Sequence, residues 1–138
     1  MTYTAWDKDP PYEDVAKIDI PFPIEKYSKL LKLCNLEADK DLSDENIALI
    51  FVNAVFKWLK GEWSLDDLSC IGNKFWYERK EKNELDELGN ALYASSEAGY
   101  YIRRIYRPEI KEKNDNFSRF VISIMKYYEL NRELVIKE

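Results

Sequence analysis

Apolar residues recur every three or four positions through most of this chain, which is the spacing of an α-helix that packs on one side. The spacing predicts five helices: residues about 24–37, the stretch between Ser43 and Gly61, the stretch from Ser64 to about residue 78, residues up to about 106 that begin after Asn83, and residues about 115–131. Short connections between consecutive helices favour antiparallel neighbours. The sequence therefore predicts an all-α fold, an antiparallel bundle of four to five helices.

Start and stop signals support these boundaries. Ser43 and Asn83 are good N-caps, and Ser64 with Asp67 three residues later is a capping-box pattern. Pro108 stops the fourth helix, and a polar loop over residues 109–114 leads to the fifth. The predicted core consists of the apolar stripes of these helices: Tyr27, Leu30, Leu31, Cys34, Ile47, Ile50, Phe51, Ala54, Val55, Trp58, Leu65, Leu68, Ile71, Phe75, Trp76, Phe117, Phe120, Val121, Ile124 and Tyr128.

The first 23 residues follow a different pattern. They hold four of the five prolines and show no helical period. We expect an extended arm that packs Trp6, Tyr12 and Phe22 onto the bundle. The whole chain, residues 1–138, is then a single domain, with the arm over 1–23, the bundle over 24–131 and a tail over 132–138.

Charge narrows the choice of partner. The net charge is -5, and residues 62–97 alone carry nine acidic and four basic side chains. The charged stretch 78–84 within this segment indicates a solvated helix end. Nucleic acid is not an expected partner, because binding to it needs basic patches that displace counterions. A basic protein is the expected partner for such a surface.

Missing residue types exclude much of enzyme chemistry. The chain has no histidine, two widely separated cysteines and no glycine-rich phosphate loop, so common triads and zinc sites are excluded. What remains is Mg²⁺ chemistry on carboxylates. Glu84 with Glu87 and Glu112 with Asp115 loosely match the spacing of all-α nucleotide pyrophosphohydrolases, but the second pair falls in the predicted loop. We expect no catalytic residues, no metal and no cofactor.

The cellular setting follows from similar observations. The first residues are neither basic nor apolar enough for a signal peptide, and no apolar run is long enough to span a membrane. We therefore expect a cytoplasmic protein that does not bind membranes. In that compartment Cys34 and Cys70, which lie among apolar residues on helical patterns, are expected to be reduced and buried.

The fourth predicted helix has two contrasting sides. Leu85, Leu88, Leu92, Ser95, Gly99, Ile102 and Tyr106 share one sector, in which Ser95 and Gly99 let a neighbouring helix come close. The opposite side carries Asp86, Asn90, Tyr93, Glu97, Tyr100 and Arg104. This side is either an ordinary wet surface, which the N-terminal arm could cover, or a binding face. Exposed tyrosines beside a central carboxylate favour a binding face that receives a cation.

The stretch from residue 56 to about 128 resembles the family of colicin-like self-protective immunity proteins, which includes the colicin D immunity protein. The resemblance rests on Lys57-Trp-Leu-Lys-Gly-Glu at a helix end, Ser64-Leu-Asp-Asp-Leu opening the next helix, Leu92-Tyr-Ala-Ser-Ser-Glu97 in a long helix, and Phe120-Val-Ile-Ser-Ile-Met-Lys-Tyr in the last helix. The chain departs from the family by its extra N-terminal arm and helix, and by Arg103, Arg104 and Arg107 where the family tends to have acids.

The resemblance implies an antidote. Members of the family are small helical bundles that block the active site of a basic ribonuclease toxin with acidic groups that mimic the substrate. The family's glutamate corresponds to Glu97 of this chain. Tyr93 and Tyr100 would then pack where bases or riboses lie, and Asp86 and Glu87 would extend the anionic track. Such an antidote is expected to be a monomer before it binds. The alternative is a helical adaptor or regulatory domain that dimerises through the tyrosine-bearing face.

Overall fold

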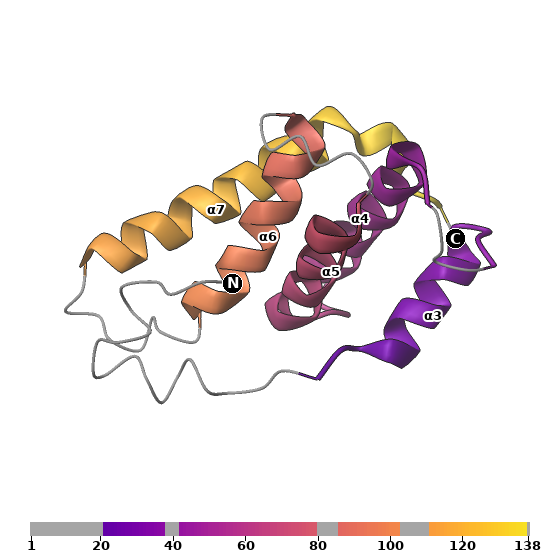
Figure 1. Ribbon diagram of the computed structural model, residues 1–138, viewed down its shortest axis with the longest axis horizontal. Coiled ribbons are helices and arrows are strands. Elements are labelled where there is room, and N and C mark those ends of the chain that lie inside the picture. Colours follow the sequence, from indigo (N-terminus) through magenta and orange to yellow (C-terminus); the bar gives the residue numbers. More distant parts are fainter. Residues whose placement is uncertain (1–20, 38–41, 80–85, 103–110, 138) are drawn as a thin grey trace.

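Helix α4 (Asp44–Leu59) lies at the centre of the protein and contacts every other described helix. The computed structural model describes residues 21–37, 42–79, 86–102 and 111–137, with the backbone alone at 100–102 and 111–116. Around α4 lie α3 (Ile24–Leu33), α5 (Leu65–Glu78), α6 (Glu87–Ile102), α7 (Lys111–Leu130) and the short 3₁₀ helix η1 (Arg132–Leu134) (Figure 1). The described residues contain no strand, so the predicted all-α class is confirmed.

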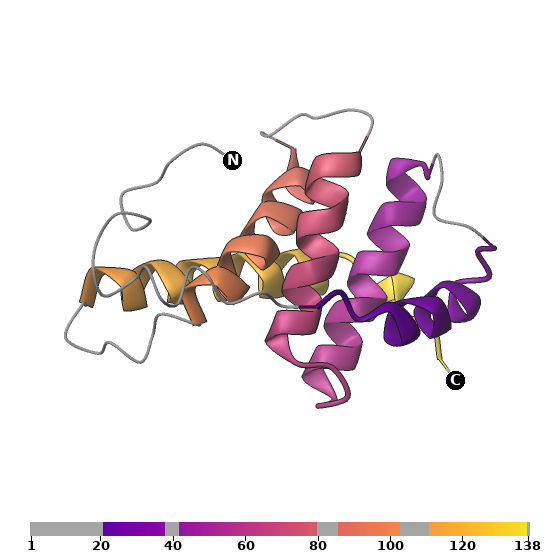
Figure 2. The same ribbon diagram turned by 60° about the horizontal axis from the view of Figure 1, so that its bottom comes forward.

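Helices α4 and α5 run side by side in opposite directions, and both α3 and α7 run across this pair (Figure 2). Helix α6 packs closely on α5 and on α7. The central position of α4 explains a difference from the predicted stripe: residues 50–55 are buried without a break, because neighbours cover this helix on nearly every side.

The predicted helix starts at two serines are confirmed. The Ser43 Oγ accepts a hydrogen bond from the Asn46 backbone N–H at 3.1 Å and caps α4. At the start of α5, the Asp67 N–H donates to Ser64 Oγ and the Ser64 N–H donates to the Asp67 carboxylate, each at 3.0 Å. This reciprocal pair satisfies two amide groups that a helix start leaves open.

Three boundaries differ from the sequence prediction. Helix α3 ends at Leu33 and not near residue 37, because Asn35 adopts a left-handed conformation with φ of 62°. Helix α7 begins at Lys111, inside the predicted polar loop, where the side chains are good helix formers without an apolar period. Helix α6 begins at Glu87, preceded by Asp86 in the capping position; the predicted cap Asn83 lies outside the described residues.

The C-terminal residues pack on α4, where the sequence predicted only a tail. The Asn53 side chain, 1% exposed, donates from Nδ2 to the Leu134 carbonyl at 3.0 Å and accepts from the Ile136 N–H at 2.8 Å. The same Nδ2 donates to the Leu49 carbonyl at 2.8 Å. A primary amide that pairs with a backbone N–H and C=O holds η1 and the residues after it against the central helix.

Small residues let α5 and α6 approach closely, as predicted for Ser95 and Gly99. The Ser95 Oγ donates to the Leu68 carbonyl and the Ser69 Oγ donates to the Ser96 carbonyl, both at 2.9 Å. A methyl group at Gly99 would collide with Ser69. The two hydroxyl bonds therefore link the helices in both directions at a separation that larger residues could not reach.

Most of the predicted N-terminal arm lies outside the described residues, whereas both cysteines lie within them. Phe22 packs edge-on against Tyr27, with ring centroids 5.3 Å apart, as the predicted arm required; Trp6 and Tyr12 lie outside the described residues. Both cysteines are free thiols. Cys34 is buried and its desolvation raises the pKa of the thiol to about 11, whereas Cys70 is only half-buried, less enclosed than predicted.

Candidate functional site

The outer face of α6, formed by Asn90, Tyr93 and Glu97, lies on the side of the helix that the core does not use. Asn90 and Tyr93 are exposed, and the Tyr93 side chain retains 42% of its exposure. The opposite side is buried at Leu88, Leu92 and Ser95. The predicted division of this helix into a core side and a solvent side is confirmed for these residues.

Tyr93 stands in an aromatic cluster drawn from three helices. Its ring centroid lies 5.2 Å from that of Trp76 on α5 and 6.0 Å from that of Phe120 on α7, at tilted and edge-on angles that aromatic pairs favour. Contact with these two rings restricts the Tyr93 ring while leaving part of it in solvent. A large, rigid and partly exposed aromatic side chain is a typical anchor of protein interfaces.

Glu97 differs in part from the prediction. Its side chain is half-buried, and its Oε2 atom is shielded from solvent. The expectation that the whole carboxylate points into water is therefore wrong. Glu97 still lies on the same side of α6 as Tyr93, one turn further along the helix. Partial burial lowers the local dielectric, so a cation that reached this carboxylate would interact with it more strongly than in open water.

Asp86 does not extend an anionic track, contrary to expectation. Its Oδ1 accepts a hydrogen bond from the Gly89 N–H at 2.7 Å and from Nη1 of Arg79 at 3.0 Å, and its Oδ2 is bonded to Nη2 of the same guanidinium. The Arg79 hydrogen bonds lower the pKa of Asp86. The charge of this carboxylate is thus largely neutralised within the protein, whereas its neighbour Glu87 is exposed.

Arg79 joins the ends of three helices. Its guanidinium, 4% exposed, also pairs with Asp44 through Nε and Nη2, both at 3.0 Å. Asp44 opens α4, Asp86 precedes α6 and Arg79 follows α5, so one cation bridges three elements. Both carboxylates raise the pKa of Arg79, which stays charged. The prediction of a solvated helix end at 78–84 is wrong at Arg79; residues 80–85 are outside the described part.

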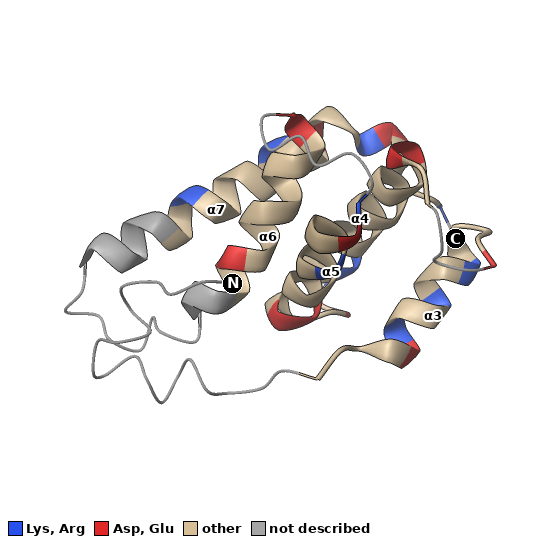
Figure 3. Cartoon of the chain, viewed as in Figure 1, with Lys and Arg blue, Asp and Glu red and all other residues tan. Residues whose placement is uncertain are grey.

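The end of the bundle around Arg79 is nevertheless acidic. Figure 3 shows red at the starts of α4 and α6, where Asp44 and Glu45 and then Asp86 and Glu87 meet the positive ends of helix dipoles. The negative charge at this end also acts on Tyr127 of α7. Burial, followed by the field of Glu87, raises the pKa of that phenol to about 12. Glu45 and Glu87 are both exposed at this end, so their carboxylates remain available to a basic partner.

Two predicted site residues add nothing to this geometry. Tyr100 belongs to α6, but its side chain is outside the described residues, and so is the whole of Arg104. The structure thus brings Asn90, Tyr93 and Glu97 together, with Glu87 at the start of the same helix. Sequence reasoning missed the partners of Tyr93: Trp76 and Phe120 were assigned to the core, and both are half-buried beside this face.

The described residues also bear on the expectations about metal ions and membranes. There, no three cysteine or carboxylate side chains gather as metal ligands would. Glu84 is outside this part of the chain, as are the side chains of Glu112 and Asp115, so the Mg²⁺ spacing is left as a sequence pattern. None of the described helices combines the length and the apolar content that crossing a bilayer requires.

Comparison with known proteins adds no assignment. No protein family, no characterised protein and no solved structure matches this chain.

Proposed function

We propose that this protein is an immunity protein, which binds and inhibits a basic ribonuclease toxin through the outer face of α6. The observation that carries the proposal is the exposed Tyr93 ring, which contacts Trp76 and Phe120 and is followed one turn later by Glu97. The resemblance to colicin-like immunity proteins in residues 92–97 and the net charge of -5 support the same function.

The contact combines two kinds of interaction. An arginine or lysine in the toxin's RNA-binding cleft would pair with Glu97, whose partial burial strengthens the pair. The Tyr93 ring would offer its face to the same cleft, where it can stack on a guanidinium or occupy the place of a base. Exposed Asn90 adds a hydrogen-bonding amide beside the ring. Asp86 takes no part, because Arg79 holds it.

Electrostatic attraction sets how the complex forms. The negative net charge and the exposed acid at the start of α6 draw a basic protein toward this end of the bundle. Such steering raises the association rate and weakens as salt shortens the Debye length. We expect association to slow markedly between low and physiological ionic strength, while dissociation changes little.

The proposal predicts that a ribonuclease toxin is encoded beside the gene of this protein, and the test is to mix the two purified proteins. Complex formation on size-exclusion chromatography together with loss of RNA cleavage is the expected result. RNA cleavage at an undiminished rate with a stoichiometric excess of this protein would reject the immunity function. A catalytically inactive ribonuclease variant should still form the complex, because inhibition acts through binding.

A second function, an adaptor that dimerises through the same face, is favoured by the aromatic cluster of Trp76, Tyr93 and Phe120. Three aromatic side chains at one surface are also typical of a homodimer contact. Sedimentation equilibrium separates the two functions. The immunity function predicts a monomer that leaves the face open, and the adaptor function predicts a dimer that Tyr93→Ala dissociates.

A further inference from the structure

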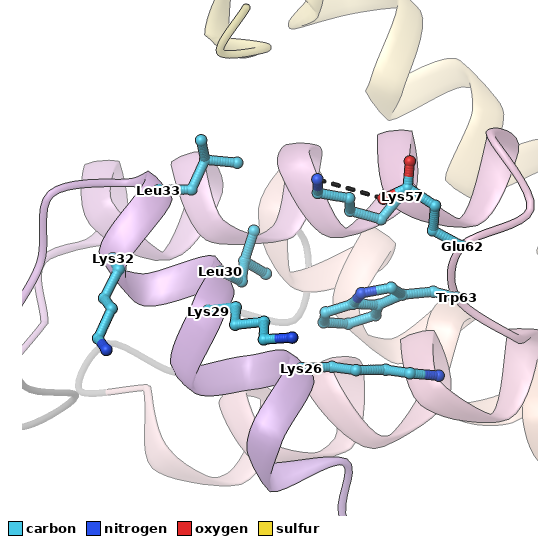
Figure 4. A pocket seen from close by; sticks show the side chains of 8 residues that line it. All are labelled: Lys26, Lys29, Leu30, Lys32, Leu33, Lys57, Glu62 and Trp63. Atoms are coloured by element: carbon cyan, nitrogen blue, oxygen red, sulfur yellow. Dashed lines mark ion pairs between the residues drawn. The ribbon is translucent and has the colours of Figure 1, made fainter. Parts of the chain in front are cut away.

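A pocket lies on the other side of the bundle, between α3 and the segment that joins α4 to α5 (Figure 4). Its volume is about 530 Å³, which is in the range of small-molecule sites. The lining combines four lysines, one glutamate and three apolar side chains: Lys26, Lys29, Lys32, Lys57, Glu62, Leu30, Leu33 and Trp63. We name it the lysine pocket. Helix α3 and the outer face of α6 lie on opposite sides of α4 and α5 (Figure 1).

The sequence builds the positive charge from two helices. Lys26, Lys29 and Lys32 are spaced three apart, so they follow one side of α3, which carries blue patches in Figure 3. Lys57 comes from the last turn of α4. Four lysines against one glutamate make this a basic site in a protein whose net charge is -5. The net negative charge of the protein repels anions, whereas the lysines of this pocket attract them.

Half of these lysines have acid partners nearby and half do not. The Lys26 Nζ lies 2.6 Å from Asp67 Oδ2, and the Lys57 Nζ lies 3.3 Å from Glu62 Oε1. Lys29 and Lys32 make no ion pair with any acid in the described part of the chain. The pocket therefore has cationic groups whose charge no described side chain neutralises. An anion entering beside them gains attraction without displacing an internal pair.

An apolar wall completes the site. Trp63 is 6% exposed and Leu30 is 2% exposed, so both are held in the core and line the pocket only with the small part of their surface that stays open. Figure 4 shows the Lys26 and Lys29 side chains extending toward the Trp63 ring and Lys57 above it, while Lys32 points away. An apolar lining with ammonium groups beside it fits a ligand that has an apolar part and an anionic group at one end.

We infer that the lysine pocket binds a small organic anion, in which a phosphate or carboxylate group is attached to an aromatic or similarly flat apolar part. The anionic group lies beside Lys29, whose charge no described acid neutralises, and the apolar part lies against the apolar lining around Trp63. This ligand differs in charge from the basic protein partner proposed for α6, so the inference is independent of the proposed function.

The probe is phenyl phosphate, which carries both features, and the measurement is a ¹H–¹⁵N NMR titration of the full chain. The indole N–H of Trp63, assigned with Trp63→Phe, should shift together with amides of α3 and of residues 57–63. The amides of α6 should not move. Shifts spread evenly over the surface, or absent from the pocket, would overturn the proposal.

A matched pair of charge reversals tests the recognition. Lys29→Glu lies in the pocket, and Lys126→Glu lies on α7; both lysines are exposed and make no ion pair in the described part of the chain, so each change alters net charge equally. We expect Lys29→Glu to weaken phenyl phosphate binding about tenfold or more and Lys126→Glu to leave it within about twofold. Equal weakening by both variants would overturn the proposal in favour of bulk charge.

Inorganic phosphate tests the apolar wall. It carries the same charged group without the ring, so it should bind several-fold more weakly than phenyl phosphate and shift the Trp63 indole signal less. Equal affinity for both probes would contradict a ligand with an apolar part. Phenol, which has the ring without the charge, should also bind more weakly, and equal binding of phenol would contradict the role of the lysines.

Discussion

The side-chain amide of Asn53 uses both of its ends inside the protein. Its Nδ2 bonds to the carbonyls of Leu49 and Leu134, and its Oδ1 bonds to the Ile136 N–H. In the sequence, Asn53 interrupts an apolar run and looks like a polar position of α4. Helical spacing could not reveal its role, because two of its partners lie more than eighty residues further along the chain.

Asn53→Ala should destabilise the protein by about 2 kcal/mol, because it leaves a part-buried carbonyl and a part-buried N–H without their partner. Urea unfolding followed by circular dichroism measures the loss. Asn90→Ala, at an exposed amide of α6, is the control and should change stability by no more than about 0.5 kcal/mol. If Asn53→Ala lowered the free energy of unfolding no more than Asn90→Ala does, Asn53 would not be what holds the C-terminal residues against α4.

Asp86 shows how a single residue can satisfy a helical pattern and still have a different role. Its position on the helical wheel placed it with the binding face, but its carboxylate caps α6 and pairs with Arg79. A helical wheel gives the direction of a side chain around its own helix axis. It cannot show that Arg79, at the end of another helix, contacts Asp86. The same wheel predicted the exposure of Tyr93 and Asn90 correctly, because no other element covers them completely.

Folding lowers the pKa of Asp86, chiefly through the Arg79 hydrogen bonds. Its contribution to stability is therefore present above the unfolded carboxyl pKa of about 3.9 and is lost as pH falls through the lower folded value. Asp86→Asn keeps a capping oxygen but removes the charge. At about pH 6 it should cost about 1–2 kcal/mol, and the difference should shrink toward zero at about pH 2.

Urea unfolding at both pH values measures this dependence. Glu45→Gln removes one exposed charge from the neighbouring α4 start and should stay within about 0.5 kcal/mol of the unsubstituted protein at about pH 6. If Asp86→Asn cost the same at both pH values, the Arg79 pair would not be the source of the stability.

At the scale of elements, α5 and α6 approach each other closely at their small residues. A Cβ placed at Gly72 would lie 2.7 Å from the Leu92 carbonyl oxygen and from the Ser95 Cβ. Gly72→Ala should therefore force the helices apart and cost about 1–3 kcal/mol, despite the better helix propensity of alanine. Asn73→Ala, on the exposed side of the same helix, should cost no more than about 0.5 kcal/mol. Thermal or urea unfolding of both variants measures the difference, and a neutral Gly72→Ala would contradict the close approach.

Element boundaries were predictable wherever a local signal exists. Ser43 and Ser64 act within three residues of themselves, so a capping pattern in the sequence was sufficient. The start of α7 was not predictable in this way, because residues 111–114 are polar and carry no apolar period. The end of α3 depends on the left-handed Asn35, a conformation that asparagine tolerates but does not require.

At the scale of the whole molecule, the helices found among the described residues, and the antiparallel run of α4 and α5, followed from apolar spacing and short connections. The central place of α4 did not, because a helix buried on nearly every side has no distinctive stripe. The aromatic cluster of Trp76, Tyr93 and Phe120 is likewise a tertiary feature, assembled from three helices. The sequence predicted the exposure of Asn90 and Tyr93 correctly. Glu97 is half-buried where full exposure was expected, and Asp86 is paired with Arg79 where a free acid was expected.

The proposed ligands of the lysine pocket and of the outer face of α6 have opposite charges: an anion in the pocket and a basic protein on α6. The pocket gathers lysines around Trp63, and the outer face of α6 presents Tyr93 with a half-buried carboxylate. Because α3 and α6 lie on opposite sides of the central helices, a ligand in the pocket would not block a protein on α6 (Figure 1). We expect phenyl phosphate to leave the affinity for the ribonuclease partner unchanged.

The central claim is that a basic partner binds the outer face of α6 through Tyr93 and Glu97. Isothermal titration of the neighbouring ribonuclease domain with Glu97→Ala and Tyr93→Ala tests it most directly, after circular dichroism shows both variants folded. Each should weaken binding about thirtyfold, equal to about 2 kcal/mol, whereas Glu133→Ala on η1 should leave it within about twofold. Unchanged affinity for both α6 variants would contradict the account.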